Sequence, residues 1–78
     1  MESSIAGRIS QVLSPLIGEV LTRVSLELES KRLGKTPETL AAEDLDEFAH
    51  NLEQQLRLVV GPEVAAKAAE RVGDLQSA

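Results

Sequence analysis

The residues best suited to chemistry in this sequence are a glutamate and the single histidine, spaced as Glu47-x-x-His50. On an α-helix, the i, i+3 spacing places both side chains on one face, as in the carboxylate–histidine ligands of di-metal helical bundles. Those bundles use two such motifs and further inward-pointing carboxylates. His50 follows Phe48 by two residues, so on a helix it is expected to point away from the core. The motif indicates an exposed acidic face; a metal-binding helical assembly using Glu47 and His50 is kept as an alternative.

Other chemistry has little support. Gly34-Lys35-Thr36 resembles the end of a phosphate-binding loop, but that motif needs a glycine where Glu29 stands and a preceding strand. The chain has no cysteine and no tyrosine, so general acid–base catalysis would depend on one histidine or on carboxylates placed at salt-bridge spacings. A small helical domain also leaves little room for a substrate pocket. We expect no enzymatic activity, catalytic residue, cofactor, resident metal or small-molecule substrate.

The charge balance limits the classes of partner that this protein is expected to bind. The formal net charge is −5, which disfavours contact with nucleic acid or anionic lipid. The local basic cluster of Lys31, Arg32 and Lys35 is typical of residues that complement a helix C-terminus. No apolar run approaches the length of a membrane span, and the opening MESSIAGR is unlike a signal peptide. The expectation is a cytoplasmic protein with no membrane contact.

The strongest helical pattern covers residues 14–33. Ser14 and Pro15 suit a helix start, and Gly34 suits its end. This pattern predicts a central helix whose apolar stripe is buried by the rest of the chain. The stripe consists of Ile17, Val20, Leu21, Val24 and Leu28.

A first helix, capped by Ser3 or Ser4, is predicted before Pro15. Its apolar row, which includes Ile9 and Leu13, continues in phase across the proline. Proline either starts a new helix or kinks a continuous one. Because no loop residues stand between the two patterns, we expect two helices joined or kinked at Pro15.

After Gly34, the segment TPETL is expected to form a short turn that directs Leu40 inward. Ala42 then opens a third helix, and Gly61-Pro62 separates it from a fourth. Glu-first i, i+4 pairs such as Glu27 with Lys31 support the helical interpretation. The prediction is an all-α fold: one domain over residues 1–78, a bundle of about four helices completed by dimerisation, with residues 1–3 and 76–78 frayed. The stripe of the third helix consists of Leu45, Phe48, Ala49, Leu52, Leu56, Val59 and Val60.

The segment from Glu19 to Leu52 resembles the later half of a histone fold, in which a long middle helix ends in basic residues and a loop containing Lys-Thr leads to Ala-Glu-Asp-Leu at the start of the last helix. The residues that carry the resemblance are Lys35, Thr36, Ala42, Glu43, Asp44 and Leu45. The loop here is longer, and the loop expected before the middle helix is missing. The acidic balance also argues against DNA wrapping.

Four apolar residues lie off or at the edge of the main stripes: Leu26, Leu33, Leu58 and Val59. A helix that is apolar on more than one side is usually covered on more than one side. These residues are therefore predicted to contact a second copy or a helix of a partner protein, although they could instead cover loops within one protomer. The expected function is a homodimeric interaction, regulatory or adaptor module. The alternative is an acidic, histone-like or DNA-mimicking regulator of nucleic-acid machinery.

Overall fold

The computed structural model describes residues 4–76, and every regular element in that range is helical. The predicted all-α bundle of four helices is thereby confirmed for the described range. The expected fraying of residues 1–3, 77 and 78 falls outside it. The elements are α1 (Ile5–Ile17), α2 (Glu19–Arg32), the 3-10 turns η1 (Pro37–Thr39) and η2 (Ala42–Asp44), α3 (Leu45–Val60) and α4 (Pro62–Asp74).

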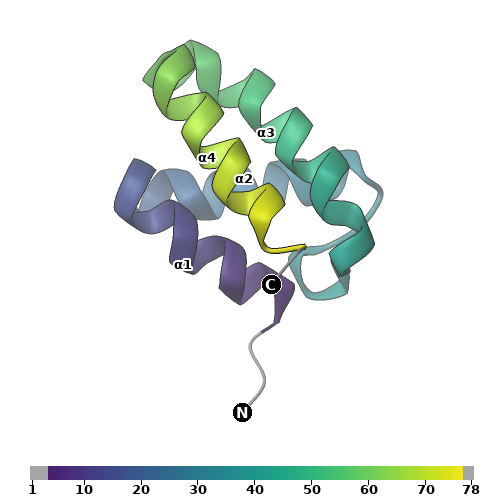
Figure 1. Ribbon diagram of the computed structural model, residues 1–78. Helices are drawn as coiled ribbons and strands as arrows, with labels where there is room; N and C mark the ends of the chain where they lie inside the picture. Colours follow the sequence, from purple (N-terminus) through teal and green to yellow (C-terminus); the bar gives the residue numbers. More distant parts are fainter. Residues whose placement is uncertain (1–3, 77–78) are drawn as a thin grey trace.

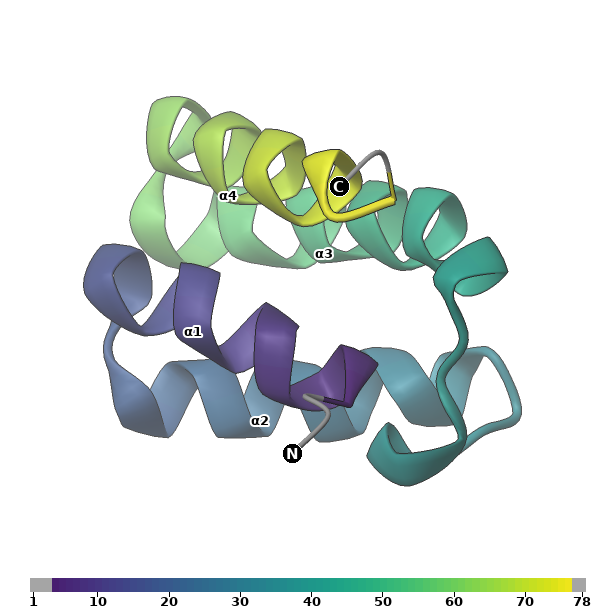
Figure 2. The same cartoon turned by 60° about the horizontal axis from the view of Figure 1, so that its bottom comes forward.

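The four helices form two hairpins stacked on each other. Helices α1 and α2 make one hairpin, and α3 and α4 make the other (Figure 1). Contacts of α1 with α4 and of α2 with α3 hold the hairpins together. The segment with η1 and η2 joins them at one end (Figure 2), while both hairpin corners lie at the opposite end. The long middle helix implied by the histone-fold resemblance is not found in this arrangement, because α2 has only 14 residues.

The break between the first two helices lies at Gly18, so the predicted position at Pro15 is wrong. Helix α1 includes Pro15 and ends at Ile17. Proline removes one helical hydrogen bond, yet the helix continues for two residues beyond it. The Gly18 amide still donates to the Ser14 carbonyl at 2.9 Å. At the other end of α1, the Ser4 hydroxyl accepts from the Gly7 amide at 2.9 Å, which confirms the expected cap.

Both hairpin corners are single glycines in the same backbone conformation. Gly18 has φ 87° and ψ 161°, and Gly61 has φ 89° and ψ 164°. This region of backbone space is open essentially only to glycine. Each glycine ends one helix and accepts the first hydrogen bond of the next, from Thr22 and Ala65 respectively. The chain therefore reverses direction at each corner through one residue.

Replacing Gly18 with alanine is expected to destabilise the protein by about 1–2 kcal/mol, because a Cβ is strained at this φ and ψ. No atom lies within 4 Å of the new Cβ, so the loss measures backbone strain alone. Gly73→Ala is the matched control: Gly73 is inside α4, its Cβ would also meet open space, and helix propensity favours alanine there. Urea unfolding followed by circular dichroism compares the two; equal effects would contradict the strained corner.

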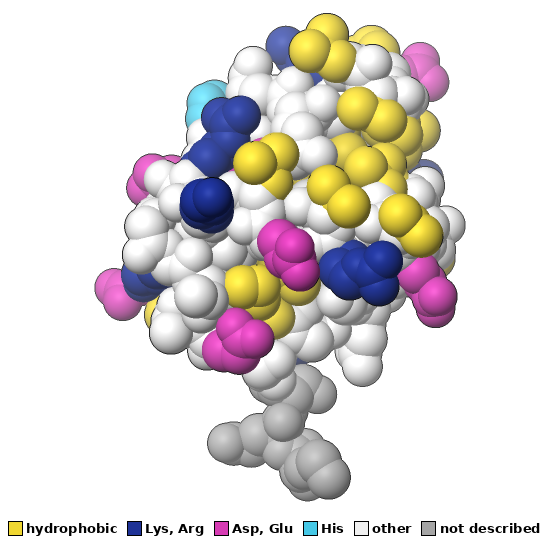
Figure 3. Space-filling model, turned by 180° about the vertical axis from the view of Figure 1, so that it is seen from behind, with side chains coloured by type: hydrophobic (Ala, Val, Ile, Leu, Met, Phe, Trp, Pro, Cys, Tyr) yellow, Lys and Arg dark blue, Asp and Glu magenta, His cyan; other side chains and the backbone are white. Residues whose placement is uncertain are grey.

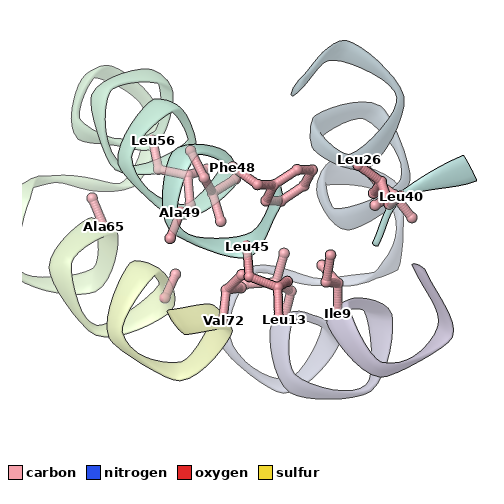
Figure 4. Close-up of a cluster of buried hydrophobic side chains, with 12 residues drawn as sticks. Ile9, Leu13, Leu26, Leu40, Leu45, Phe48, Ala49, Leu56, Ala65 and Val72 are labelled. Atoms are coloured by element: carbon pink, nitrogen blue, oxygen red, sulfur yellow. The ribbon is translucent and has the colours of Figure 1, made fainter. Parts of the chain in front are cut away.

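The core is apolar and receives side chains from all four helices. Phe48 of α3 lies among Ile9 and Leu13 of α1 and Leu26 of α2 (Figure 4). The predicted inward position of Leu40 is confirmed. The predicted α3 stripe is confirmed from Leu45 to Leu56 but not at Val59, which is exposed. The buried apolar residues are Ile9, Leu13, Leu26, Leu40, Leu45, Phe48, Ala49, Leu52, Leu56, Ala65, Ala68 and Val72.

Helix α2 packs with the opposite face from the one predicted. Val20, Val24 and Leu28 of the expected buried stripe are exposed, and Leu21 and Ile17 are only half-buried. The residues that face the interior are instead Thr22, Ser25, Leu26, Glu29 and Ser30. The prediction that this stripe is the centre of the fold is therefore wrong. Two features account for this orientation. The chain changes direction at Gly18, and the small Ser and Thr side chains on the inward side of α2 fit against the neighbouring helices.

Of the helices within residues 4–76, none has both the length and the hydropathy required to cross a membrane.

Candidate interaction surface

The outward side of α2 carries an apolar row at i, i+4, i+8 spacing. Val20 is 68% exposed, Val24 48% and Leu28 39%. Large exposed hydrophobic residues that gather on one side of a small protein mark a contact surface, whereas single ones are ordinary. Because the helical repeat places all three on one side of α2, they form one continuous strip.

The end of α3 extends this strip. The Gln55 side-chain amide donates to the Ser25 hydroxyl at 2.9 Å, so this part of α3 lies beside the middle of α2. Val59 lies one turn beyond Gln55 on the same side of α3 and is 60% exposed; its neighbour Leu58 is 92% exposed. Figure 3 shows hydrophobic side chains gathered on this side of the molecule. We call these residues the exposed apolar face: Val20, Val24, Leu28, Leu58 and Val59.

The four residues predicted as a partner interface separate into two groups. Leu26 is buried in the core, and Leu33 is half-buried and packs against it. These two are used inside the protomer. Leu58 and Val59 are exposed and belong to the exposed apolar face.

The inward side of α2 is polar and incompletely satisfied. The Ser30 hydroxyl donates to the Leu26 carbonyl at 2.6 Å, and Ser25 accepts from Gln55. Within residues 4–76, however, several buried oxygens have no hydrogen-bond partner. They are Thr22 Oγ1, both carboxylate oxygens of Glu29, and Gln55 Oε1. Helix α2 therefore buries costly groups while it exposes apolar ones.

Glu29 is the most costly of these groups. Its side chain is fully buried, and its only ionic contact among residues 4–76 is Arg32 Nε, at 3.4 Å from Oε1. Burial raises the pKa of the Glu29 carboxyl, and the Arg32 charge opposes this only in part. The Arg32 side chain is itself mostly exposed, so water screens its charge.

The Gly34-Lys35-Thr36 segment serves a structural role. Gly34 has φ 73° and ends α2: the Lys35 amide bonds to the Ser30 carbonyl and the Gly34 amide to that of Lys31, both at 2.9 Å. This is the Schellman pattern. Lys35 Nζ then contacts Asp44 Oδ2 at 2.6 Å, and Asp44 also accepts from the Ala41 amide. The hydrogen bonds from Lys35 and Ala41 lower the pKa of Asp44.

Glu47 and His50 are both exposed on α3, which confirms the expected outward position of the histidine. Between residues 4 and 76, no three His, Asp or Glu side chains come together in a way that could hold a metal ion.

The sequence pattern missed Val20, Val24 and Leu28 as surface residues because it assigned them to the core. A signal for the other orientation was present in the sequence. Gly18 interrupts the row between Ile17 and Val20, and serines occupy positions 25 and 30 on the opposite side of α2. If the helix ends at Gly18, the apolar row before the glycine no longer indicates which side of α2 is buried.

No protein-family model, curated protein or solved structure matches this chain. The arrangement of its own residues is therefore the basis for a functional proposal.

Proposed function

We propose that this protein is a non-enzymatic helical interaction module that self-associates through the exposed apolar face. The supporting observation is the exposure of five large aliphatic side chains on α2 and α3 in a chain of 78 residues. A domain of this size has a limited core and gains burial by associating. The mechanism is packing of helix faces, with the hydrophobic effect as the driving force.

Leu58→Asp is expected to disrupt self-association without unfolding the protomer, because Leu58 is 92% exposed and contributes little to the core. Burial of a leucine is worth about 1.5–3 kcal/mol, and a twofold interface contains each position twice. We therefore expect the dissociation constant to rise at least about 100-fold. Analytical ultracentrifugation of the full chain from micromolar to millimolar concentration measures this change.

Ala66→Asp is the matched control. Ala66 is exposed on α4, and its replacement by aspartate introduces the same charge outside the exposed apolar face. Its association is expected to equal that of the wild type. A wild type that stays monomeric at millimolar concentration would contradict the proposal, as would equal disruption by both variants.

A further inference from the structure

A row of alternating charges borders the apolar strip of α2 on the side away from α3. Glu19, Arg23, Glu27 and Lys31 recur at i, i+4 spacing and are all exposed. The first three each precede a residue of the strip by one position, and Lys31 follows Leu28 by three. We call these four residues the charged row. The ion pairs within residues 4–76 are Glu29–Arg32, Lys35–Asp44 and Glu53–Arg57, so the charged row is free to pair with another molecule.

We propose that the partner is a second copy of this chain, and that the two α2 helices pack antiparallel about a twofold axis near Val24. This inference rests on the proposed function and specifies its geometry. In an antiparallel pair related by a twofold axis, the same edge of each helix faces its counterpart in reverse order. The charged row therefore meets its own reversed copy.

The order of charges fits this arrangement at every position. The row reads negative, positive, negative, positive from Glu19 to Lys31, so its reverse has the opposite sign throughout. Glu19 then faces Lys31 of the second copy, and Arg23 faces Glu27 of the second copy. Opposite charges across an interface select the orientation and register of partners.

Competing arrangements lose these contacts. In a parallel pair related by a twofold axis, the same edge of the two helices lies on opposite sides of the contact, so the two charged rows do not meet. An antiparallel pair shifted by one helical turn brings Glu19 opposite Glu27, or Arg23 opposite Lys31. Like charges placed across a contact are unfavourable and suppress that arrangement.

The apolar strip selects the same register. Its midpoint is Val24, and the midpoint of the charged row lies between Arg23 and Glu27, about one residue or about 1.5 Å further along the helix. In the antiparallel pair Val20 faces Leu28 of the second copy. Because α3 lies on the other side of the strip, Leu58 and Val59 of both copies border the same interface.

The test uses two charge-reversal variants, Arg23→Glu and Glu27→Arg. Alone, each variant places two like-charged pairs across the twofold axis, and we expect its dissociation constant to rise about tenfold or more. Mixed in equal amounts, one chain has glutamate at both positions and the other has arginine at both. The mixture is expected to form heterodimers at least as tightly as the wild type, measured by native mass spectrometry of an isotope-labelled and an unlabelled chain.

A cysteine cross-link provides a measurement that does not depend on charge. The chain has no cysteine of its own, so Val20→Cys and Leu28→Cys each add one unique thiol. A disulfide needs Cα atoms within about 7 Å. The two variants mixed are expected to cross-link to each other, whereas Val20→Cys alone is expected not to cross-link to itself.

The outcomes separate this inference from the proposed function. A monomeric wild type would overturn both. A wild type that Leu58→Asp disrupts, but whose two charge variants do not recover on mixing, would overturn the antiparallel geometry alone. Self-cross-linking of Val20→Cys would show parallel helices. Masses above the dimer would overturn the closed twofold arrangement.

Discussion

Phe48→Ala is expected to lower the free energy of unfolding by about 3–5 kcal/mol, which is the usual cost of truncating a fully buried phenylalanine. Phe48 is the largest of the fully buried side chains and the only aromatic residue in the sequence. It lies where α3 meets α1 and α2 (Figure 4). A domain of 78 residues has a total stability of about 4–12 kcal/mol. The substitution therefore removes a large part of the free energy of unfolding, and we expect a substantial unfolded fraction at room temperature.

Urea unfolding followed by far-ultraviolet circular dichroism measures this effect, because the chain has no tryptophan or tyrosine for fluorescence. Gln54→Ala is the control: Gln54 is exposed on the same helix, and its effect is expected to stay within about 0.5 kcal/mol. A loss below about 1 kcal/mol for Phe48→Ala would mean that Phe48 does not fill the contact of α3 with α1 and α2 as described.

Glu29→Met is expected to stabilise the protein by about 2 kcal/mol at pH 7, in the opposite direction from most core substitutions. The wild type buries a carboxylate that has no hydrogen-bond partner within the described range. Methionine is of similar length, is a good helix former and places apolar atoms against the core. Arg32 is mostly exposed, so removal of Glu29 leaves no buried charge unpaired.

The pH dependence of the stability gain from Glu29→Met shows whether the buried carboxylate charge is its cause. The raised pKa of Glu29 means that the folded protein binds this proton more tightly than the unfolded chain does. Wild-type stability from this group therefore falls as pH rises from about 4.5 through the folded-state pKa, and the full penalty is present above it. The advantage of Glu29→Met is expected to be large at pH 7, to shrink as pH falls through the folded-state pKa, and to lose its pH-dependent part below about pH 4.5, where the wild-type carboxyl is neutral in both states.

Glu53→Met is the matched control for this substitution. Glu53 also has an arginine neighbour, Arg57 at 3.8 Å, but its side chain is partly exposed to water. Its replacement is expected to change stability by less than about 0.5 kcal/mol. Destabilisation by Glu29→Met, or a gain that does not depend on pH, would contradict a penalty from the buried charge.

Asp44 adds the opposite trend at lower pH. Its lowered pKa means that its hydrogen bonds with Lys35 and Ala41 contribute to stability above the ordinary value of 3.8, and this contribution is lost as pH falls through the folded-state pKa. The two groups act in separate pH ranges, so stability in the Glu29→Met background isolates the contribution of Asp44.

Local rules were sufficient to predict the presence of α3 and α4 and the turn between them. The predicted start of α3 at Ala42 is wrong, because Ala42–Asp44 form the 3-10 turn η2 and α3 begins at Leu45. In α3, the spacing from Leu45 to Leu56 matches the buried side, and Gly61-Pro62 marks both the end of α3 and the start of α4. The inward position of Leu40 follows from the short η1 turn that precedes it. In each case the apolar periodicity, the caps and the observed packing agree.

The candidate surface was predicted only in part. Leu58 and Val59 stand apart in the pattern and are exposed, whereas Leu26 stands apart in the same way and is buried. Apolar periodicity identifies which side of a helix avoids water, but it does not distinguish burial inside the chain from burial against another molecule. For α2 the two possibilities lead to opposite orientations.

The sequence by itself determined the helical class, the end of α2 at Gly34, the Gly61 corner and the buried side of α3, because these depend on interactions within a few residues of the chain. Only the tertiary structure decided that the first corner is Gly18 and that α2 turns Ser25 and Glu29 inward and Val24 outward. The reason is geometric. A single glycine at each corner sets the direction in which the second helix of a hairpin leaves the first, and this direction determines which side of α2 meets α1 and α3. The apolar side left in water is what makes association with a second copy the natural proposal for this protein.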